Sequence, residues 1–269
     1  GLGAGVVIAA PSVVLSIVLG WSEVATIFVI GISTTLYTMF GGVQAVTWTD
    51  VKQMTLIFGG LFVVILIIIS QFPSGVSFTD GFYLAGALGK LETVNATLDP
   101  NEILTEKYTL WSGVIAALFL FLSYFGCDQS QVQRFLTAKS VSEGRTSLLM
   151  SGFLKIPMQF GILTVGILVF VFYQFATPPM IFNPVEAKRI EQSTEYAAIQ
   201  QKFSEAHAHR SEAAVKYVES RSDETKDEYV KANAAFEAAR ADATSLVRSV
   251  SGNESFNDVN YVFPRFILD

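Results

Sequence analysis

The sequence predicts an all-α protein: a polytopic membrane helix bundle that carries an extramembrane antiparallel helical hairpin. Two observations predict this fold class. Hydrophobic residues make up 51% of the 269 residues, only 16% are charged, and the mean hydropathy is +0.44, whereas about a quarter of an average soluble domain is charged. The charged residues are also unevenly placed, because 24 of the 42 lie in residues 176–262. One part of the chain therefore suits lipid and the other suits water.

Residues 1–175 contain five apolar segments, each about long enough to span a bilayer as a helix of roughly 20 residues. A run such as LFVVILIII in the third segment is hydrophobic all round, whereas a helix of a soluble protein shows an apolar stripe. This pattern favours membrane helices over a large soluble helical protein. The chain begins at Gly1 within apolar sequence, so we expect a fragment that begins inside a helix. The five predicted transmembrane helices cover residues 2–21, 24–42, 51–72, 110–127 and 146–175.

Basic residues in short loops predict the orientation of the bundle, because they concentrate on the cytoplasmic side. Loops 42–52 and 128–145 contain Lys52, Lys139 and Arg145, whereas the loops on the other side are mainly acidic. We therefore expect loops 42–52 and 128–145 to be cytoplasmic and the protein to lie in the cytoplasmic membrane. Residues 176–259 then form an extracytoplasmic insertion, and residues 260–269 lead into the next membrane helix.

The insertion shows two apolar stripes with helical spacing. Asn183 and Pro184 resemble a helix N-cap and first helical residue, with Glu186 as a capping-box acid. The stripes predict an antiparallel hairpin over residues 184–250, which would offer a surface for an extracytoplasmic protein partner. His207 and His209 are two residues apart, so we expect them on opposite sides of a helix and exposed. The stripes consist of Tyr196, Ile199, Phe203, Ala206, Arg210, Ala213 and Tyr217, and of Tyr229, Ala232, Phe236, Ala239, Ala243, Leu246 and Val250, with Arg210 the one polar member.

Composition also excludes some classes of function. The net charge of −6 argues against a nucleic-acid-binding protein, which needs a basic surface. A single cysteine, Cys127, excludes an internal disulfide.

Lys155 is the clearest candidate for a functional residue within an apolar segment, where a charge is costly. It lies about 15 Å along a helix from Arg145, near the middle of the membrane. Pro157 follows and removes an amide donor, which leaves a backbone carbonyl without its helical partner. An ammonium group in such a place suits a polar cavity that holds a solute. The alternative is an ion pair with Asp128 that only holds two helices together.

Aromatic and polar residues end the fourth segment. Phe121 and Tyr124 are three residues apart and share a helix face, and Phe125, Asp128 and Gln129 follow. An aromatic face with a polar tip can cover the apolar side of a small solute. Aromatic residues at this spacing more often pack in a core, and the residues alone favour packing.

Polar residues also mark the predicted cytoplasmic loops. Gln133 and Arg134 follow the fourth segment, where an anchoring role for Arg134 is as good an interpretation as a functional one. Thr49 and Asp50 precede the third segment, where a hydroxyl and a carboxylate could hold a sodium ion transiently, because hard cations prefer oxygen ligands. Capping of a helix N-terminus is the alternative role, and the residues alone favour it. No other metal site is predicted.

Three stretches resemble signature segments of the sodium:solute symporter family. They are GGVQAVTWTDVKQ (residues 41–53), YFGCDQSQVQRFLTAKS (124–140) and SGFLKIPMQF (151–160). The resemblance covers residues 1–175 and resumes at residues 260–269, so the hairpin lies outside it. It implies an inverted-repeat fold of ten core helices, with substrate near the middle of the membrane and alternating access. The five segments resemble core helices three to seven.

The resemblance also implies roles for single residues. Tyr124 matches an aromatic residue that closes over the substrate from the inner side, and Lys155 matches a lysine that contacts the substrate in sugar carriers. Asp50 matches a carboxylate on the sodium exit route. Phe121 stands where sugar carriers have a polar residue, which makes a sugar substrate less secure and an organic anion more plausible. The family's main sodium site lies on helices outside these residues.

The predicted function is sodium-coupled symport of a small organic solute, namely a sugar, a sugar acid or an organic anion. Sodium is the coupling ion, no cofactor is expected, and no enzymatic step is predicted. The alternative is a sensor or scaffold that binds solute without transport and uses the hairpin to bind a partner.

Overall fold

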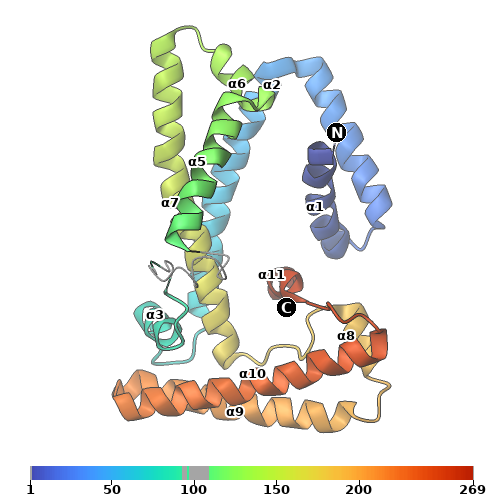
Figure 1. Cartoon of the computed structure of the whole chain (residues 1–269), viewed down its shortest axis with the longest axis vertical. Coiled ribbons are helices and arrows are strands. Elements are labelled where there is room, and N and C mark those ends of the chain that lie inside the picture. The colour runs from blue at the N-terminus through green and yellow to red at the C-terminus, as the bar shows by residue number, and fades with distance from the viewer. Residues whose placement is uncertain (1, 93–95, 97–108, 269) are drawn as a thin grey trace. The chain divides into compact units, whose positions relative to one another are not determined.

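The computed structural model describes residues 2–92, 96 and 109–268, and every regular element in this part of the chain is a helix (Figure 1). The chain divides into two compact units. One unit combines residues 1–87 with residues 166–269, and the other is formed by residues 88–165. The fold class is therefore all-α, as predicted.

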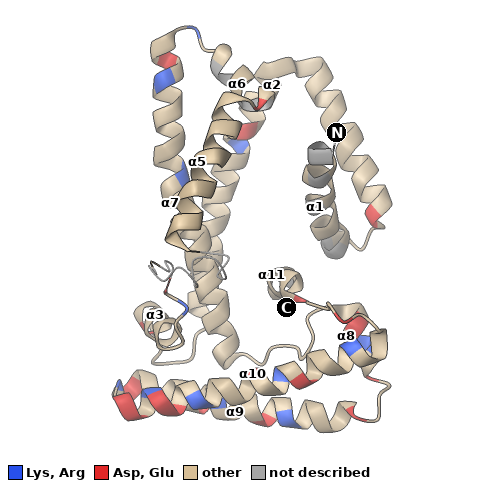
Figure 2. Cartoon of the chain, viewed as in Figure 1, with Lys and Arg blue, Asp and Glu red and all other residues tan. Residues whose placement is uncertain are grey.

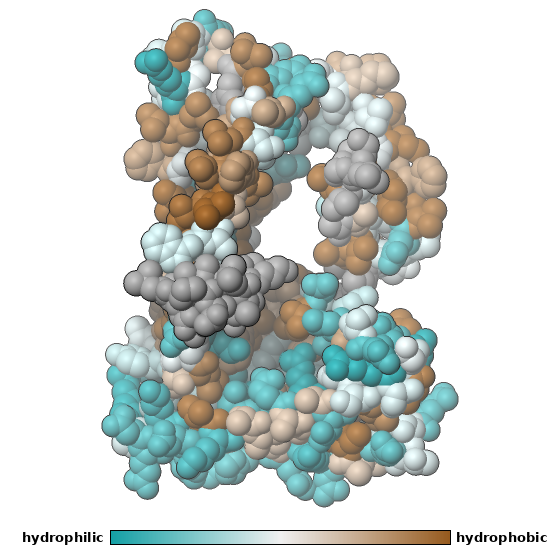
Figure 3. Space-filling view, viewed as in Figure 1, coloured by the Kyte–Doolittle hydropathy of each residue, from teal (hydrophilic) through white to brown (hydrophobic). Residues whose placement is uncertain are grey.

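The first unit begins with two apolar helices, α1 (Leu2–Leu19) and α2 (Glu23–Ser70). Ser22 caps α2, since its side chain accepts a hydrogen bond from the amide of Ala25 at 3.3 Å. The 48 residues of α2 cover the second and third predicted spans. Among the described residues, α2 and α7 (Val141–Phe175) are long and apolar enough to cross a membrane. Figure 3 shows the hydrophobic surface of these helices.

A kink at Gly42 divides α2. Gly42 has φ 55° and ψ −153°, a conformation outside the helical region that glycine tolerates because it has no Cβ. Helix resumes directly after this residue, so the prediction of a loop over residues 42–52 was wrong. The interruption is confined to one glycine, because the apolar sequence on both sides favours helix formation.

The second unit contains α5 (Leu110–Gly126), the short α6 (Gln129–Leu136) and the first part of α7. Thr109 and Ser112 form a capping box at the start of α5. Most of the predicted loop over residues 128–145 is thus helical. The helix α7 continues through Pro157 without a break in its assignment.

In the first unit, the short helix α3 (Phe78–Ala87) packs between the ends of α2 and α7. A Cβ placed on Gly81 would lie 3.5 Å from the side chain of Val171 and 3.6 Å from the Phe72 ring. Leu84 and Leu168 are fully buried in the same region. These contacts form a small apolar core at the end of the membrane helices, and the hairpin contacts this core.

The insertion folds into a helical hairpin. Its two long helices lie side by side and antiparallel (Figure 1), since Phe203 meets Phe236 at 4.9 Å between ring centroids and Tyr217 meets Tyr229 at 6.0 Å. Most of the charged residues in view lie on these helices (Figure 2). The elements after α7 are α8 (Pro184–Ile190), α9 (Tyr196–Ser220), α10 (Asp223–Ser251), the 3₁₀ helix η1 (Val259–Tyr261) and α11 (Val262–Leu268).

The buried seam of the hairpin contains many residues of the predicted stripes, but it also includes Ala214, which they lacked, and it differs from them at His207 and Val250. His207 is only 4% exposed, so the prediction of an exposed side chain was wrong, whereas His209 is exposed. Val250 is 43% exposed, and Val247 is buried in its place. His207 lies four residues after Phe203 and three before Arg210, on one helix face, which places it in the seam.

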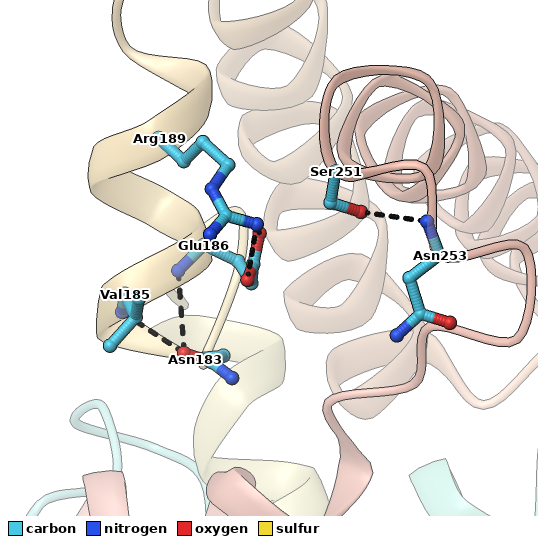
Figure 4. A network of polar contacts seen from close by, with 6 residues as sticks. All are labelled: Asn183, Val185, Glu186, Arg189, Ser251 and Asn253. Atoms are coloured by element: carbon cyan, nitrogen blue, oxygen red, sulfur yellow. Dashed lines mark hydrogen bonds and ion pairs between the residues drawn. The ribbon is translucent and has the colours of Figure 1, made fainter.

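The start of the insertion is capped as the sequence predicts. The side chain of Asn183 accepts hydrogen bonds from the amides of Val185 at 3.0 Å and Glu186 at 3.3 Å (Figure 4). The carboxylate of Glu186 pairs with Arg189 at 2.9 Å. Glu186 therefore forms a pair within its own helix and not the reciprocal bond of a capping box.

Candidate functional site

The predicted substrate-contacting residues of the second unit lie on α5 and α7. The rings of Phe121 and Phe125 are 5.9 Å apart, and the ring of Tyr124 meets that of Phe125 edge-on at 5.1 Å. The three rings therefore form one aromatic cluster at the end of α5. Tyr124 is half-buried, whereas Phe121 and Phe125 are exposed.

Lys155 extends from α7 to this cluster. Its Nζ lies 5.3 Å from the centroid of the Tyr124 ring, which is within the range of a cation–π interaction. Among the described residues, no ion pair joins Lys155 to Asp128. Whether Lys155 contacts a solute or only holds helices together stays a prediction. The arrangement combines a cation with an aromatic face, which suits contact with an anionic or polar solute.

The polar residues after α5 belong to the turn into α6. Asp128 is exposed, and its carbonyl accepts a hydrogen bond from the amide of Val132 at 2.9 Å. Gln129 and Gln133 are exposed on α6, and the backbone of Arg134 belongs to the same helix. The side chain of Arg134 lies outside the part of the chain that the structure describes. A role for these residues in solute binding stays a prediction.

The predicted sodium waypoint lies in the other unit, on α2. Thr49 and Asp50 lie inside the helix, eight residues or fewer after the kink, so their assignment as N-terminal caps was wrong. The hydroxyl of Thr49 donates to the carbonyl of Ala45 at 2.8 Å. Both side chains are half-buried. Their part in sodium passage stays a prediction.

A second polar cluster, which the sequence did not mark as a site, surrounds Arg210 in the hairpin. Arg210 is 2% exposed, and its guanidinium donates to the carbonyl of Tyr173 at 2.6 Å and stacks on Phe236 at 3.5 Å. The hydroxyl of Tyr229 donates to the side chain of Gln174 at 3.2 Å. These bonds attach the hairpin to the end of α7. The one signal in the sequence was the polar Arg210 in an apolar stripe.

His207 belongs to the same cluster. Burial lowers the pKa of His207, and the charge of Arg210 lowers it further, while hydrogen bonds that the imidazole donates to the backbone of Tyr173 and Ala176 act in the opposite direction. Its ring lies 5.8 Å from that of Phe236. The imidazole is therefore a neutral part of the hairpin core at physiological pH.

The tip of the hairpin is attached to α3. Arg221 bonds to the carboxylate of Asp80 and lies 4.5 Å from the centroid of the Tyr83 ring. Burial raises the pKa of Asp80, but hydrogen bonds from Ser77 and Arg221 together outweigh it, so the pKa lies below its usual value. Arg221 also ends α9 with φ 50°, a left-handed conformation. The helix end thus directs this arginine to the carboxylate.

The start and the end of the insertion are joined by Asp258. Its carboxylate accepts from the amide of Phe182 at 2.7 Å and from Arg240 at 3.3 Å. Arg240 also lies 5.0 Å from the centroid of the Phe182 ring. The hairpin therefore leaves and rejoins the rest of the chain at one point.

Several known proteins are similar to this chain. The human sodium/iodide cotransporter is 30% identical over 66% of the chain and 26% of its own length. The sodium-dependent multivitamin transporter of Oryctolagus cuniculus is 31% identical over 63% of the chain and 26% of its length. The sodium-coupled monocarboxylate transporter 1 of Mus musculus is 34% identical over 54% of the chain and 22% of its length.

The chain spans about a quarter of the length of these relatives. No solved structure matches it. A sequence model of the sodium:solute symporter family matches residues 4–201, which include the membrane helices and the first six residues of α9. This match covers well over half of the chain, and it agrees with the all-α fold and the long apolar helices. The chain therefore belongs to the sodium:solute symporter family and is part of an integral membrane protein.

Proposed function

We propose that the full-length protein couples the inward movement of sodium to the uptake of a small organic anion. The observation that carries this proposal is the position of Lys155 beside the Tyr124 ring, 5.3 Å from its centroid. A cation within an apolar helix needs a partner, and a carboxylate is the strongest one available from a solute. The relatives that carry iodide, vitamins and monocarboxylates support an anion more than a sugar.

Phe121 supports the same choice. By the family resemblance, it stands where sugar carriers have a polar residue, and its ring has no hydrogen-bond donor or acceptor for a solute. A sugar needs several hydrogen-bond partners, whereas a small monocarboxylate needs one cation and an apolar wall. Transport by alternating access and a sodium exit route at Asp50 belong to the same proposal. One charge that crosses 100 mV supplies about 2.3 kcal/mol, which suffices for accumulation.

Uptake into proteoliposomes tests this proposal. The full-length protein is reconstituted with an inward sodium gradient, and uptake of labelled lactate, nicotinate, iodide and glucose is compared with uptake in choline. We expect sodium-dependent uptake of a carboxylate and none of glucose. Sodium-dependent glucose uptake without carboxylate uptake would refute the anionic substrate. Tight solute binding without any flux would instead favour a sensor that uses the hairpin to bind a protein partner.

Replacement of Lys155 sharpens this test. Lys155→Met keeps the length of the side chain and removes its charge, so we expect the KM for the carboxylate to rise about tenfold or more. Lys155→Arg keeps the charge and serves as the matched control, and we expect it to raise the KM for the carboxylate by less. Equal KM values for the wild type and Lys155→Met would show that Lys155 does not bind the carboxylate and has only a structural role.

A further inference from the structure

A cavity of about 230 Å³ lies where the hairpin meets the end of α7 and the segment that leads into α11. Its walls include the rings of Tyr173, Phe182 and Phe236. The cavity is smaller than most pockets for drug-sized ligands, which are about 300–1,000 Å³. It is therefore suited to a ligand of few atoms that has an apolar part.

Arg210 lines this cavity as a buried cation. One of its nitrogens donates to the neutral carbonyl of Tyr173, and its Nε has no hydrogen-bond partner. Burial lowers the pKa of Arg210 to about 10, and the charge of Glu237 opposes this only in part. The side chain is thus charged at physiological pH, buried, and bonded to no carboxylate among the described residues. Such a charge is costly without an anionic partner.

The charged groups around the cavity leave a place for an anion. Arg210, Arg240 and Glu237 line it, so arginines outnumber the carboxylate. Asp258 accepts a hydrogen bond from Arg240 at 3.3 Å. Glu237 is exposed and forms no ion pair with Arg210. Arg210 therefore has an N–H without an acceptor and, among the described residues, no carboxylate bonded to its guanidinium.

We propose that this cavity binds a small carboxylate, with its oxygens on Arg210 and its apolar part against the aromatic rings. A water molecule would satisfy the N–H of Nε but would not balance the charge. A planar carboxylate does both, because guanidinium and carboxylate match in geometry and charge. The charged residues of the site, Arg210, Arg240 and Glu237, lie on the hairpin beyond the family match, which ends at residue 201, and the site does not depend on the proposed transport of an anion.

Calorimetric titration of the purified full-length protein with choline benzoate tests this site. The buffer contains choline in place of sodium, so that sodium-coupled binding near Lys155 does not contribute. We expect benzoate to bind and benzamide, its uncharged analogue of the same shape, to give no signal. Lys155→Met should bind benzoate as the wild type does. Absence of benzoate binding to the wild type, or equal binding of benzamide, would overturn the proposal.

Two variants assign the binding to the cavity. Arg210→Gln should weaken benzoate binding about tenfold or more, because it removes the charged donor. Glu237→Gln should strengthen binding, because it removes a competing negative charge from the same lining. Glu237 is exposed, so this second variant remains informative even where Arg210→Gln folds poorly. Unchanged or weaker binding in Glu237→Gln would show that the bound anion does not lie beside Glu237 and would overturn its assignment to this cavity.

Discussion

Lys155 and Arg210 both lie against aromatic rings, and their surroundings differ in a way that separates their roles. Lys155 is exposed on a membrane helix and touches the Tyr124 ring. Arg210 is buried in the hairpin, stacks on Phe236 and donates to a backbone carbonyl. Lys155 has an exposed side chain that can contact a solute. Arg210 contacts both Phe236 on α10 and Tyr173 on α7, so it also holds these two helices together. The two residues therefore belong to two separate sites.

The stability of the hairpin should depend on pH through His207. Its pKa is lowered in the folded hairpin from the usual 6.5, so the unfolded hairpin takes up a proton first as the pH falls. The free energy of opening should therefore decrease below about pH 6.5, by at most about 1.4 kcal/mol per pH unit. Hydrogen exchange of residues 196–251 in the full-length protein, corrected for intrinsic rates, measures this opening.

A matched pair of variants isolates this effect. His207→Gln places a neutral side chain in the seam and should remove the pH dependence between about pH 7.5 and 5.5. His209→Gln lies on the exposed face of the same helix and should retain it. A pH dependence that persists unchanged in His207→Gln would contradict this assignment and point to another titrating group.

The residues of the two sites differ in how well the sequence predicted them. Both the apolar sequence and the family resemblance singled out Lys155 and Tyr124. In the structure, the Nζ of Lys155 lies 5.3 Å from the centroid of the Tyr124 ring. His207 was misplaced, because spacing from His209 alone cannot say which of the two faces the partner helix. The contact of Arg210 with Tyr173 joins residues 37 positions apart. No local pattern predicts such a contact, since it depends on how the hairpin folds back onto α7.

At the level of single elements, the kink in α2 shows how one residue divides a long apolar helix. Ser22 caps its start, and the chain remains helical to Ser70 except at Gly42. Apolar length alone predicted two spans with a loop between them, whereas the structure has one helix that is interrupted at Gly42. Polar residues such as Thr49 and Asp50 are compatible with either a loop or a helix end. The backbone angles show that the helix is interrupted at Gly42 alone and that Thr49 and Asp50 lie within helix.

Gly42→Ala should therefore destabilise the protein. A Cβ at this position meets no atom within 4 Å, but the positive φ is strained for any side chain, at a cost of about 1–3 kcal/mol. Gly59→Ala in the same helix is the control, because its position is equally open and its backbone is helical. The melting temperatures of the two purified variants give the comparison. Equal values would mean that the kink is not required for the folded state.

At the level of the whole molecule, the insertion is attached to the family core at separate points. Arg221 pairs with Asp80 on α3, Arg210 donates to the end of α7, and Asp258 joins the start and end of the insertion. The pairing of α3 with the hairpin tip requires the two to lie on one side of the membrane. The assignment of that side as extracytoplasmic stays a prediction.

Removal of the hairpin tests whether it serves transport or an added role. The amide of Phe182 and the carboxylate of Asp258 are 2.7 Å apart, so a short Gly/Ser linker can replace residues 184–257 without displacing α7 or α11. The family match ends at residue 201 and includes the membrane helices. We therefore expect the deleted protein to insert and to retain sodium-dependent uptake.

The same deletion should lower the melting temperature, because Gln174 and Asp80 lose buried hydrogen-bond partners. A monodisperse, inserted deletion variant without uptake would instead make the hairpin part of the transport machinery. The double change Arg221→Ala with Arg210→Gln in the intact protein separates these explanations. If the hairpin only stabilises the protein through these attachments, the double change should lower the melting temperature, as the deletion does. Uptake should persist, because the membrane helices keep their own contacts.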